Sequence, residues 1–368
     1  MNKKLMAVAV AGALAAPAVA FAQASTVQLY GKFLFDYGVH VQQPNTPAGA
    51  SRHNADALNT GGSYLGFKGE ENLGGGLSAW FQCETDVRFL GGGATTAGAW
   101  CDRNSALGLK GGFGNVFIGT WDSPIKAASG KTRMLNETGW LGAQRIILAG
   151  PFSFSNRLAN TVNYATPKFG DFSASAQYTT VQTALDAPST ANAKGRLWGL
   201  GADYASGPLL VAAAWARHND NRSAGGVLGT SDTAWLIGAT YTMAPFKAGL
   251  TFTRSKNEPL TTTEVKRNAW NLALDYKITG PGSILFGYSH AGNASGSAAS
   301  PTTGGGAKQW QIGYNHALSK RTVGGLAYVR LDNNSTGTYN LTGLTIGAGG
   351  VQPGDNASAF VLSLTHSF

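Results

Sequence analysis

The sequence predicts an all-β fold, a 16-stranded antiparallel barrel that spans a membrane. Apolar and polar residues alternate over stretches of about ten residues, which is the period of a strand with two different faces. Short turns alternate with long polar segments along the chain. Charged residues make up 13% of the 368 residues, whereas soluble proteins carry about 25%. A barrel with an apolar outside and a polar lumen accounts for all three observations.

The first 22 residues are predicted to be a secretory signal peptide. Lys3 and Lys4 precede a mostly apolar run over 5–18, and Ala20-Phe21-Ala22 offers a small-x-small cleavage site. The run is shorter than the roughly 20 residues that a transmembrane helix needs. Cleavage after Ala22, or alternatively after Ala24, leaves one barrel domain. With the first site this domain is 23–368, and the formal charge falls from +9 to +7 with the two lysines.

Individual strands are predicted from residues of one parity. The first strand shows this clearly, because Leu29, Phe33 and Phe35 are apolar, whereas Lys32 and Asp36 lie on the other face. The same alternation recurs around 77–84, 270–276 and 360–368. Amphipathic strands also build soluble sandwiches, so the alternation alone does not establish a membrane barrel.

The connections between strands are of two kinds. Short turns, most of them with Gly or Pro, are predicted at 71–75, 111–114, 166–170, 206–208, 243–246, 279–282 and 318–321. Longer segments lie at 40–59, 88–98, 122–157, 182–194, 218–230, 255–264, 292–305 and 332–356. Seven turns and eight long segments make fifteen connections and therefore sixteen strands. Short periplasmic turns on one rim and long extracellular loops on the other are typical of bacterial outer-membrane barrels, and closure satisfies every backbone polar group in lipid.

The third long segment, 122–157, is predicted to fold into the lumen. Ser123-Pro124 is a helix cap followed by proline at the first helical position, so a short helix is expected there. The segment also carries more apolar side chains than a solvated loop, namely Trp140, Ile146, Ile147, Leu148, Phe152 and Phe154. The barrel interior is the surface on which they can pack, and the packing narrows the lumen.

Strand parity also assigns charged side chains to the lumen. Lys32, Lys68, Lys110 and Glu84 fall on the polar faces of their strands. A lysine that pointed at the lipid midplane would cost about 2–4 kcal/mol, so these residues are expected inside. Arg103 has the parity of the lipid-facing Leu107 and Leu109, a conflict unless a bulge intervenes.

The two cysteines are expected to form a disulfide. If the strands on either side of segment 88–98 pair with Leu77 opposite Leu107, then Cys83 lies opposite Cys101. The periplasm is oxidising, which favours the bond. In the alternative, the register slips by a residue or two and both cysteines remain small apolar fillers.

Several segments together resemble the trimeric general porins of Gram-negative bacteria, in the branch rich in anion-preferring members. The resemblance spans essentially the whole mature chain. The matching segments, in order, are 27–31 (VQLYG), 65–77 (LGFKGEENLGGGL), Phe81-Gln82 before Glu84, Leu107-Gly108-Leu109 leading to Gly112-Phe113-Gly114, 160–164 (NTVNY) with Thr166-Pro167 and Gly170, and 364–368 (LTHSF).

The resemblance implies a homotrimer and a third loop folded into the lumen, with basic wall side chains facing acidic groups on that loop. Arg103 and Arg157 fall where the family places constriction arginines. Asp122 and Glu137 are the acidic candidates on the loop. At Tyr64 the anion-preferring relatives commonly carry an arginine, which Lys68 on the same strand face partly replaces.

The carboxyl-terminal Phe368 has two expected roles. As an exposed aromatic at the end of the last strand, it belongs to the girdle of rings at the periplasmic interface. The resemblance implies that a terminal phenylalanine is also the signal that the outer-membrane assembly machinery reads. The two roles are compatible.

The function predicted from these features is passive diffusion of small hydrophilic solutes through a water-filled pore that prefers anions. Loop cations are expected to contact lipopolysaccharide phosphate. No cofactor, metal site or nucleic-acid partner is indicated. The alternatives are a channel that prefers one solute class, such as small organic anions or phosphate, a barrel enzyme using His218 and Asp220, and an adhesin. No catalytic partner supports the enzyme, and an adhesin or structural anchor has no use for a constriction.

The disulfide is testable by intact mass. Alkylation of the unfolded protein without reductant is expected to leave its mass unchanged, because Cys83 and Cys101 are already bonded. The same treatment after reduction should add two adducts. Two modified thiols in the sample that saw no reductant would contradict the bond.

Overall fold

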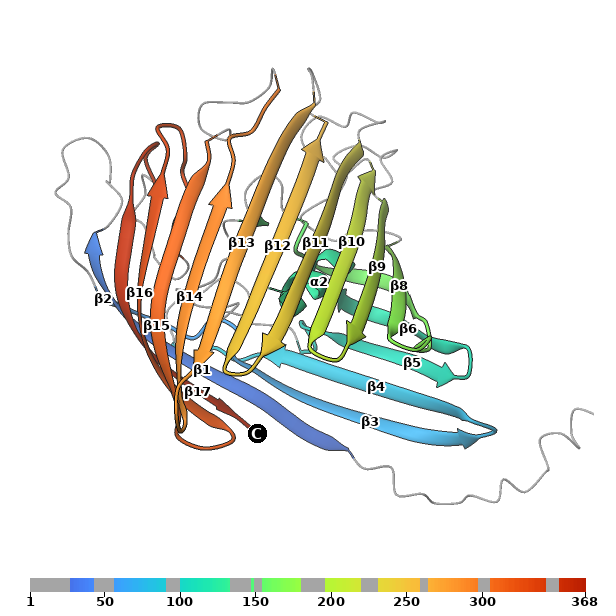
Figure 1. Ribbon diagram of the computed structural model, residues 1–368. Helices are drawn as coiled ribbons and strands as arrows, with labels where there is room; N and C mark the ends of the chain where they lie inside the picture. The colour runs from blue at the N-terminus through green and yellow to red at the C-terminus, as the bar shows by residue number, and fades with distance from the viewer. Residues whose placement is uncertain are drawn as a thin grey trace, which may run out of the picture.

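The computed structural model describes residues 27–42, 56–90, 100–132, 147–148, 154–179, 196–219, 231–258, 264–296, 305–341 and 351–368. Over these residues, seventeen strands form one continuous antiparallel sheet (Figure 1). The strands are β1 (Gln28–Gln42), β2 (Asp56–Asn59), β3 (Tyr64–Gly74), β4 (Leu77–Asp86), β5 (Ser105–Gly111), β6 (Gly114–Asp122), β7 (Arg157–Ala165), β8 (Phe172–Thr179), β9 (Arg196–Ser206), β10 (Leu209–Asn219), β11 (Ser231–Met243), β12 (Phe246–Asn257), β13 (Val265–Lys277), β14 (Gly282–Ala291), β15 (Ala307–Ala317), β16 (Thr322–Asn333) and β17 (Ala357–Ser367).

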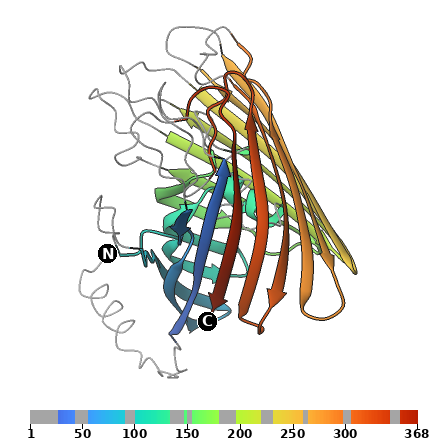
Figure 2. The same ribbon diagram turned by 90° about the vertical axis from the view of Figure 1, so that its left-hand side faces the viewer.

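The sheet closes into a barrel of sixteen positions, as the sequence predicts. Its first and last strands, β1 and β17, lie side by side (Figure 2) and pair from Lys32 with Ser367 to Gln42 with Ser358. Both β2 and β3 pair with β1, one above the other, and together occupy one position of the barrel. Residues 56–59, expected within a loop, are therefore the first part of the second barrel strand.

All seven predicted short turns join consecutive strands of the barrel. Four of them leave two residues between strands, namely Gly75-Gly76, Gly112-Phe113, Gly207-Pro208 and Ala244-Pro245. Gly207 has a φ of 53°, a backbone conformation that glycine adopts without steric penalty. The turns lie at the lower and right-hand ends of the strands in Figure 1, opposite the strand ends that lead into the long segments. The chain therefore alternates rims as the sequence predicts.

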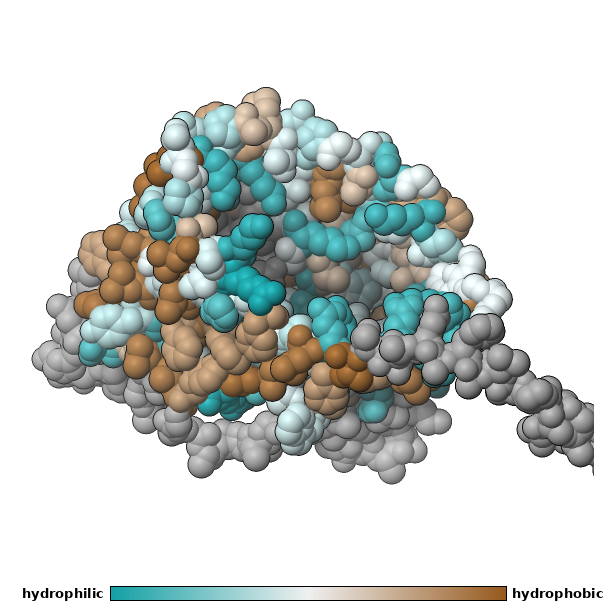
Figure 3. Space-filling model, turned by 90° about the horizontal axis from the view of Figure 1, so that it is seen from below, coloured by the Kyte–Doolittle hydropathy of each residue, from teal (hydrophilic) through white to brown (hydrophobic). Residues whose placement is uncertain are grey.

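The two faces of the wall differ in chemistry. Leu107, Leu326 and Ile237 on the outer face are 68%, 52% and 48% exposed. The inner face carries polar rows such as Asn271 and Ser289, whose side chains hydrogen bond at 3.0 Å. Seen from the rim of short turns, hydrophilic side chains surround a hollow and hydrophobic ones lie on the outer flank (Figure 3). No helix in the described residues is long and apolar enough to cross a membrane.

The helix expected after Ser123 is present and lies inside the barrel. It is α2 (Pro124–Thr132), and the Ser123 hydroxyl caps it by accepting a hydrogen bond from the Lys126 amide at 3.3 Å. At its other end, the Thr132 hydroxyl lies 2.7 Å from that of Thr251 on the inner face of β12. The prediction that segment 122–157 folds inward is confirmed for these residues.

The wall under the inward segment is built from small side chains. Ala212, Ala214 and Ala216 line the inner face of β10 and pack in one apolar cluster with Ile125 of the helix and Leu148. Phe154, also in the cluster, is 2% exposed. The short side chains leave room for the segment, and burial of its apolar groups holds it there. Glu137, Trp140, Ile146 and Phe152 lie outside the described residues.

A second segment contacts the inner wall, which the sequence did not indicate. Leu341, in the long segment after β16, is 1% exposed and belongs to the same apolar cluster as Val329, Leu331 and Val361. Those three side chains are on the inner faces of β16 and β17, opposite the exposed Leu326 and Phe360. A lumen wall in contact with water would leave them exposed, so residues near Leu341 fill part of this side of the lumen.

The disulfide Cys83–Cys101 is present, but the register that led to it is wrong. Phe81, rather than Leu77, lies opposite Leu107, a slip of four residues. The bond still forms because Cys101 precedes the strand, in a turn where its φ is 63°. Arg103 lies in the same turn, ahead of Ser105 where β5 begins. The parity of β5 therefore does not apply to Arg103, which removes the predicted conflict.

The terminal residue closes the sheet on its outer face. The backbone amides of Gly31 and Phe368 each donate to the other's carbonyl at 3.1 Å. The Phe368 ring covers Gly31, where an added Cβ would lie 2.5 Å from the ring, and packs against Phe33 with centroids 5.0 Å apart. An aromatic residue at this edge of the outer wall matches the predicted girdle.

Close contact between α2 and the wall makes Gly238 a sensitive position. A Cβ at Gly238 would lie 2.6 Å from the Thr132 hydroxyl. The substitution Gly238→Val is expected to displace the helix end, at a cost of about 1–3 kcal/mol, and to alter single-channel conductance in planar bilayers.

The matched control is Gly324→Ala, since the nearest atom to a Cβ there is 3.9 Å away. This variant should conduct like the parent protein. Unchanged conductance in Gly238→Val, with the protein folded, would show that the helix does not restrict the pore.

Candidate functional site

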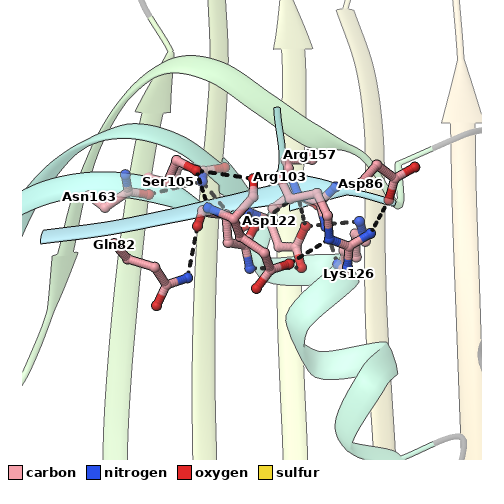
Figure 4. Close-up of polar contacts among 12 residues, drawn as sticks. Gln82, Asp86, Arg103, Ser105, Asp122, Lys126, Arg157 and Asn163 are labelled. Atoms are coloured by element: carbon pink, nitrogen blue, oxygen red, sulfur yellow. Dashed lines mark hydrogen bonds and ion pairs between the residues drawn. The ribbon is translucent and has the colours of Figure 1, made fainter. Parts of the chain in front are cut away.

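A cluster of charged side chains lies on the inner wall beside the start of α2 (Figure 4). It is built from the loop ends of β4, β6 and β7, the turn before β5, and the first turn of the helix. Four of the eight residues predicted for the constriction meet here, namely Arg103, Arg157, Glu84 and Asp122. The cluster has two parts, one centred on Arg103 and the other on Asp122.

Arg103 binds two carboxylates of β4. Its Nε lies 2.5 Å from Glu84 Oε1 and its Nη1 lies 2.8 Å from Asp86 Oδ1. The backbone fixes this arrangement, because the Arg103 amide donates to the Glu84 carbonyl at 2.9 Å and the neighbouring disulfide ties the turn to β4. Burial opposes the charged guanidinium, but the two carboxylates hold the pKa of Arg103 above its usual value.

Tyr64 occupies the position where the resemblance implies an arginine, and its ring lies beneath two neighbouring cations. The Arg103 guanidinium lies over the Tyr64 ring, 4.8 Å from its centroid, and the Lys32 ammonium lies 6.0 Å from the same ring. Cations over an aromatic face are attracted by its quadrupole. Tyr64 therefore does not supply a charge, but it helps to hold two cations near the lumen.

Asp122 is the centre of the second part. It is the last residue of β6 rather than a loop residue, and it lies opposite Arg157 at the start of β7. Its Oδ1 is 3.0 Å from Arg157 Nε and 2.8 Å from Lys126 Nζ of α2. The carboxylate thus links the wall to the helix, and Glu137 lies outside the described residues.

Asn104, which sequence reasoning missed, follows Arg103 in the chain and binds the part centred on Asp122. Its Oδ1 accepts hydrogen bonds from Arg157 Nε at 2.9 Å and from the Asp122 amide at 3.0 Å. Its carbonyl accepts one from Gln82 at 2.7 Å. Asn104 lies in the turn before β5, where strand parity gives no information. Its only sequence signal is its position next to Arg103.

The positive and negative charges in this cluster are equal in number. Three cations, Arg103, Arg157 and Lys126, contact three carboxylates, Glu84, Asp86 and Asp122. The pairs are local contacts on one side of the lumen. Among the described residues they do not form the expected arrangement of basic wall groups facing acidic loop groups.

The remaining predicted lysines lie nearer the turn rim. Lys110 forms an ion pair with Glu70 at 2.7 Å. Lys68 is exposed, and its ammonium lies 5.1 Å from the centroid of the Tyr30 ring. No carboxylate partner of Lys68 is found in the part of the chain that the structure describes. Lys68 is thus a cation on the inner wall that no acid among the described residues offsets.

Metal-binding side chains and the suggested His218–Asp220 pair can be followed only in the described residues. They contain no group of three or more His, Cys, Asp and Glu side chains placed to hold a metal ion. His218 is 5% exposed on the inner face of β10, with its ring 4.5 Å from that of Phe154. Its suggested partner Asp220 lies outside the described residues.

Comparison with known proteins agrees with this architecture. Residues 7–336 match the Gram-negative porin family. The chain is similar to outer membrane porin protein 32 of Delftia acidovorans, with 31% identity over the full length of both chains. A solved anion-selective porin from Comamonas acidovorans has a TM-score of 0.75 at 24% identity, covering 94% of this chain and 100% of the other. OmpT of Vibrio cholerae in its trimer form has a TM-score of 0.64 at 14% identity, covering 94% and 99%.

A closed antiparallel barrel with a polar lumen and an inward helix defines a membrane pore. The chain belongs to the Gram-negative porins, and it is therefore a channel protein of the outer membrane.

The site makes one pH-dependent prediction. Burial, together with the charges of Arg157 and Arg103, lowers the pKa of Lys126 despite its contact with Asp122. As the pH rises, Lys126 should lose its positive charge before an ordinary lysine does. Anion preference, measured as the reversal potential in a salt gradient, is expected to fall over that range.

The variant Lys126→Gln provides the control, because it has no charge to lose at this position. Its reversal potential should lack the change in that range. An identical pH profile in both proteins would assign the change to another group.

Proposed function

We propose that this porin is a general diffusion pore for small hydrophilic solutes and that it prefers anions. The observation that carries the preference is Lys68, an exposed cation on the inner wall without a carboxylate partner among the described residues. The charges of the cluster around Arg103 and Asp122 balance, so they add little to the mean potential. A fixed positive charge in a narrow aqueous path raises the local concentration of anions.

The predicted constriction residues have a second role in this proposal. Arg103, Arg157, Glu84 and Asp122 fix the edge of the wall against α2 and thereby set the width of the pore. The printed description of the Comamonas acidovorans structure, an anion-selective porin, also favours the anion preference. Salt screens the fields of exposed charges beyond about 8–10 Å, so the preference is expected to be moderate and strongest at low salt.

A homotrimer of the cleaved chain, 23–368, is part of the proposal. The Vibrio cholerae relative of the same fold has been solved in a trimer form. Three pores in one assembly would give conductance in three coupled steps.

Two further partners are proposed from the outer wall. Arg254, Lys266 and Lys308 lie on the outer side near the long loops, where the phosphates of lipopolysaccharide would meet them. Phe368 ends the last strand on the outer face, where the assembly machinery would reach it.

Of the alternatives, membership in a channel family favours transport over a barrel enzyme. The inward segments favour a pore over an adhesin. A channel that prefers one solute class is also compatible with the described lumen.

The proposal predicts that Lys68→Gln reduces anion preference. Reversal potentials in a salt gradient across planar bilayers should lie toward the anion equilibrium for the parent protein. They should move toward zero in the variant, because the described inner wall loses a positive charge that no described carboxylate offsets.

Arg254→Gln removes the same charge from the outer face and should leave the potential unchanged. A parent protein that favours cations would refute the preference, and a barrel that does not conduct would refute the pore.

A further inference from the structure

Between the charged cluster and the turn rim, the inner wall contains a recess of about 440 Å³. Lys68, Glu70, Trp80, Lys110, Asn115 and Trp121 contribute to its lining. Its volume is within the roughly 300–1,000 Å³ of pockets that hold small molecules. Trp80 precedes Glu84 by four residues on β4, which places the recess about 10–14 Å nearer the periplasm than the cluster.

Aromatic side chains make the wall of this recess unusual for a water-filled barrel. Trp80, Phe117 and Trp121 lie on the inner faces of β4 and β6, with Phe117 and Trp121 ring centroids 4.8 Å apart and those of Trp80 and Trp121 6.0 Å apart. Trp80 is 8% exposed, and its indole N–H donates to Asn115 at 2.8 Å. Trp121 is only half-buried. The group is therefore a fixed aromatic surface with one ring open to the lumen.

Polar groups around these rings define the charge that the recess accepts. The Lys110 ammonium lies 5.5 Å from the centroid of a Trp80 ring and is paired with Glu70. That pair leaves the Glu70 carboxylate already occupied, which disfavours an organic cation. Lys68 is exposed beside the rings without an acidic partner among the described residues. An anionic group bound in the recess would thus meet a cation.

We propose that the recess is a binding site for aromatic carboxylates, small planar rings that carry a carboxylate group. The ring would lie against Trp121 and Trp80, and the carboxylate would contact Lys68. An uncharged sugar could stack on the same rings but would leave Lys68 without a counterion, and an aliphatic acid would use Lys68 but not the rings. The inference rests on the proposed anion-preferring pore and names a solute class that the pore would favour.

The experiment compares two anions of similar size and equal charge as blockers of the ion current in planar bilayers. Benzoate has an aromatic ring, and cyclohexanecarboxylate has a saturated one. Benzoate is expected to bind about two- to tenfold more tightly in the parent protein, the range that aromatic stacking gives. Because both probes act on one protein, this comparison does not depend on any variant folding.

Variants then locate the difference. Trp121→Leu keeps an apolar side chain without a ring system and should bring the ratio of the two affinities close to one, and Trp80→Leu should lower it. Lys68→Gln should weaken both anions and leave the ratio largely unchanged. Trp235→Leu, the same substitution on the lipid-facing side of β11, is the matched control and should behave like the parent.

Equal affinities in the parent protein would overturn the inference, and so would a ratio that survives both Trp121→Leu and Trp80→Leu. These results are separate from a failure of the pore itself. Conductance and the reversal potential are measured first, without either organic anion. A protein that conducts and prefers anions but does not distinguish the two probes refutes the recess alone.

Discussion

Backbone hydrogen bonding in lipid is the constraint on which the rest of this structure depends. No water is available in the bilayer core, so each strand must pair on both sides, and the pairing of β1 with β17 removes the free edge. A ring of sixteen strand positions encloses a lumen that the wall side chains alone do not fill. The width of the path is therefore set by segments that enter the lumen, here α2 and the residues around Leu341.

The side chains of the inner wall differ according to whether one of these segments packs on them. Under α2 and Phe154 it carries alanines, of which Ala212 is fully buried. Near Leu341 it carries Val329 and Leu331, also fully buried. Elsewhere it carries polar rows such as Asn271 with Ser289. In a barrel, an apolar inward face that water does not reach is itself evidence of a segment packed on it, and the energy of that burial keeps the segment in place.

The features that the sequence predicted correctly are local ones. Strand period, the seven turns and the cap at Ser123 each depend on a few adjacent residues. The features it missed depend on distant pairings. The slip between β4 and β5 follows from the turn at Cys101, which no alternation reveals. Leu341 lies in a polar segment, and its composition does not predict contact with the barrel wall. To predict the partners of Arg103, one would need to know both the turn before β5 and the register between β4 and β5.

The arginines were expected to narrow the pore and also to give it a positive potential. The pairing of their charges separates these two properties. Arg103 and Arg157 are held by carboxylates, and the Asp122 carboxylate that binds Arg157 also binds Lys126 of the helix. The contact between Asp122 and Lys126 anchors α2 and also neutralises the charge of Lys126. The position of the helix and the electrostatic potential beside it therefore depend on the same contact. Under the proposed mechanism, the arginines fix the shape of the path. The sign of its preference then depends on Lys68, which lies beside the aromatic recess rather than in the cluster.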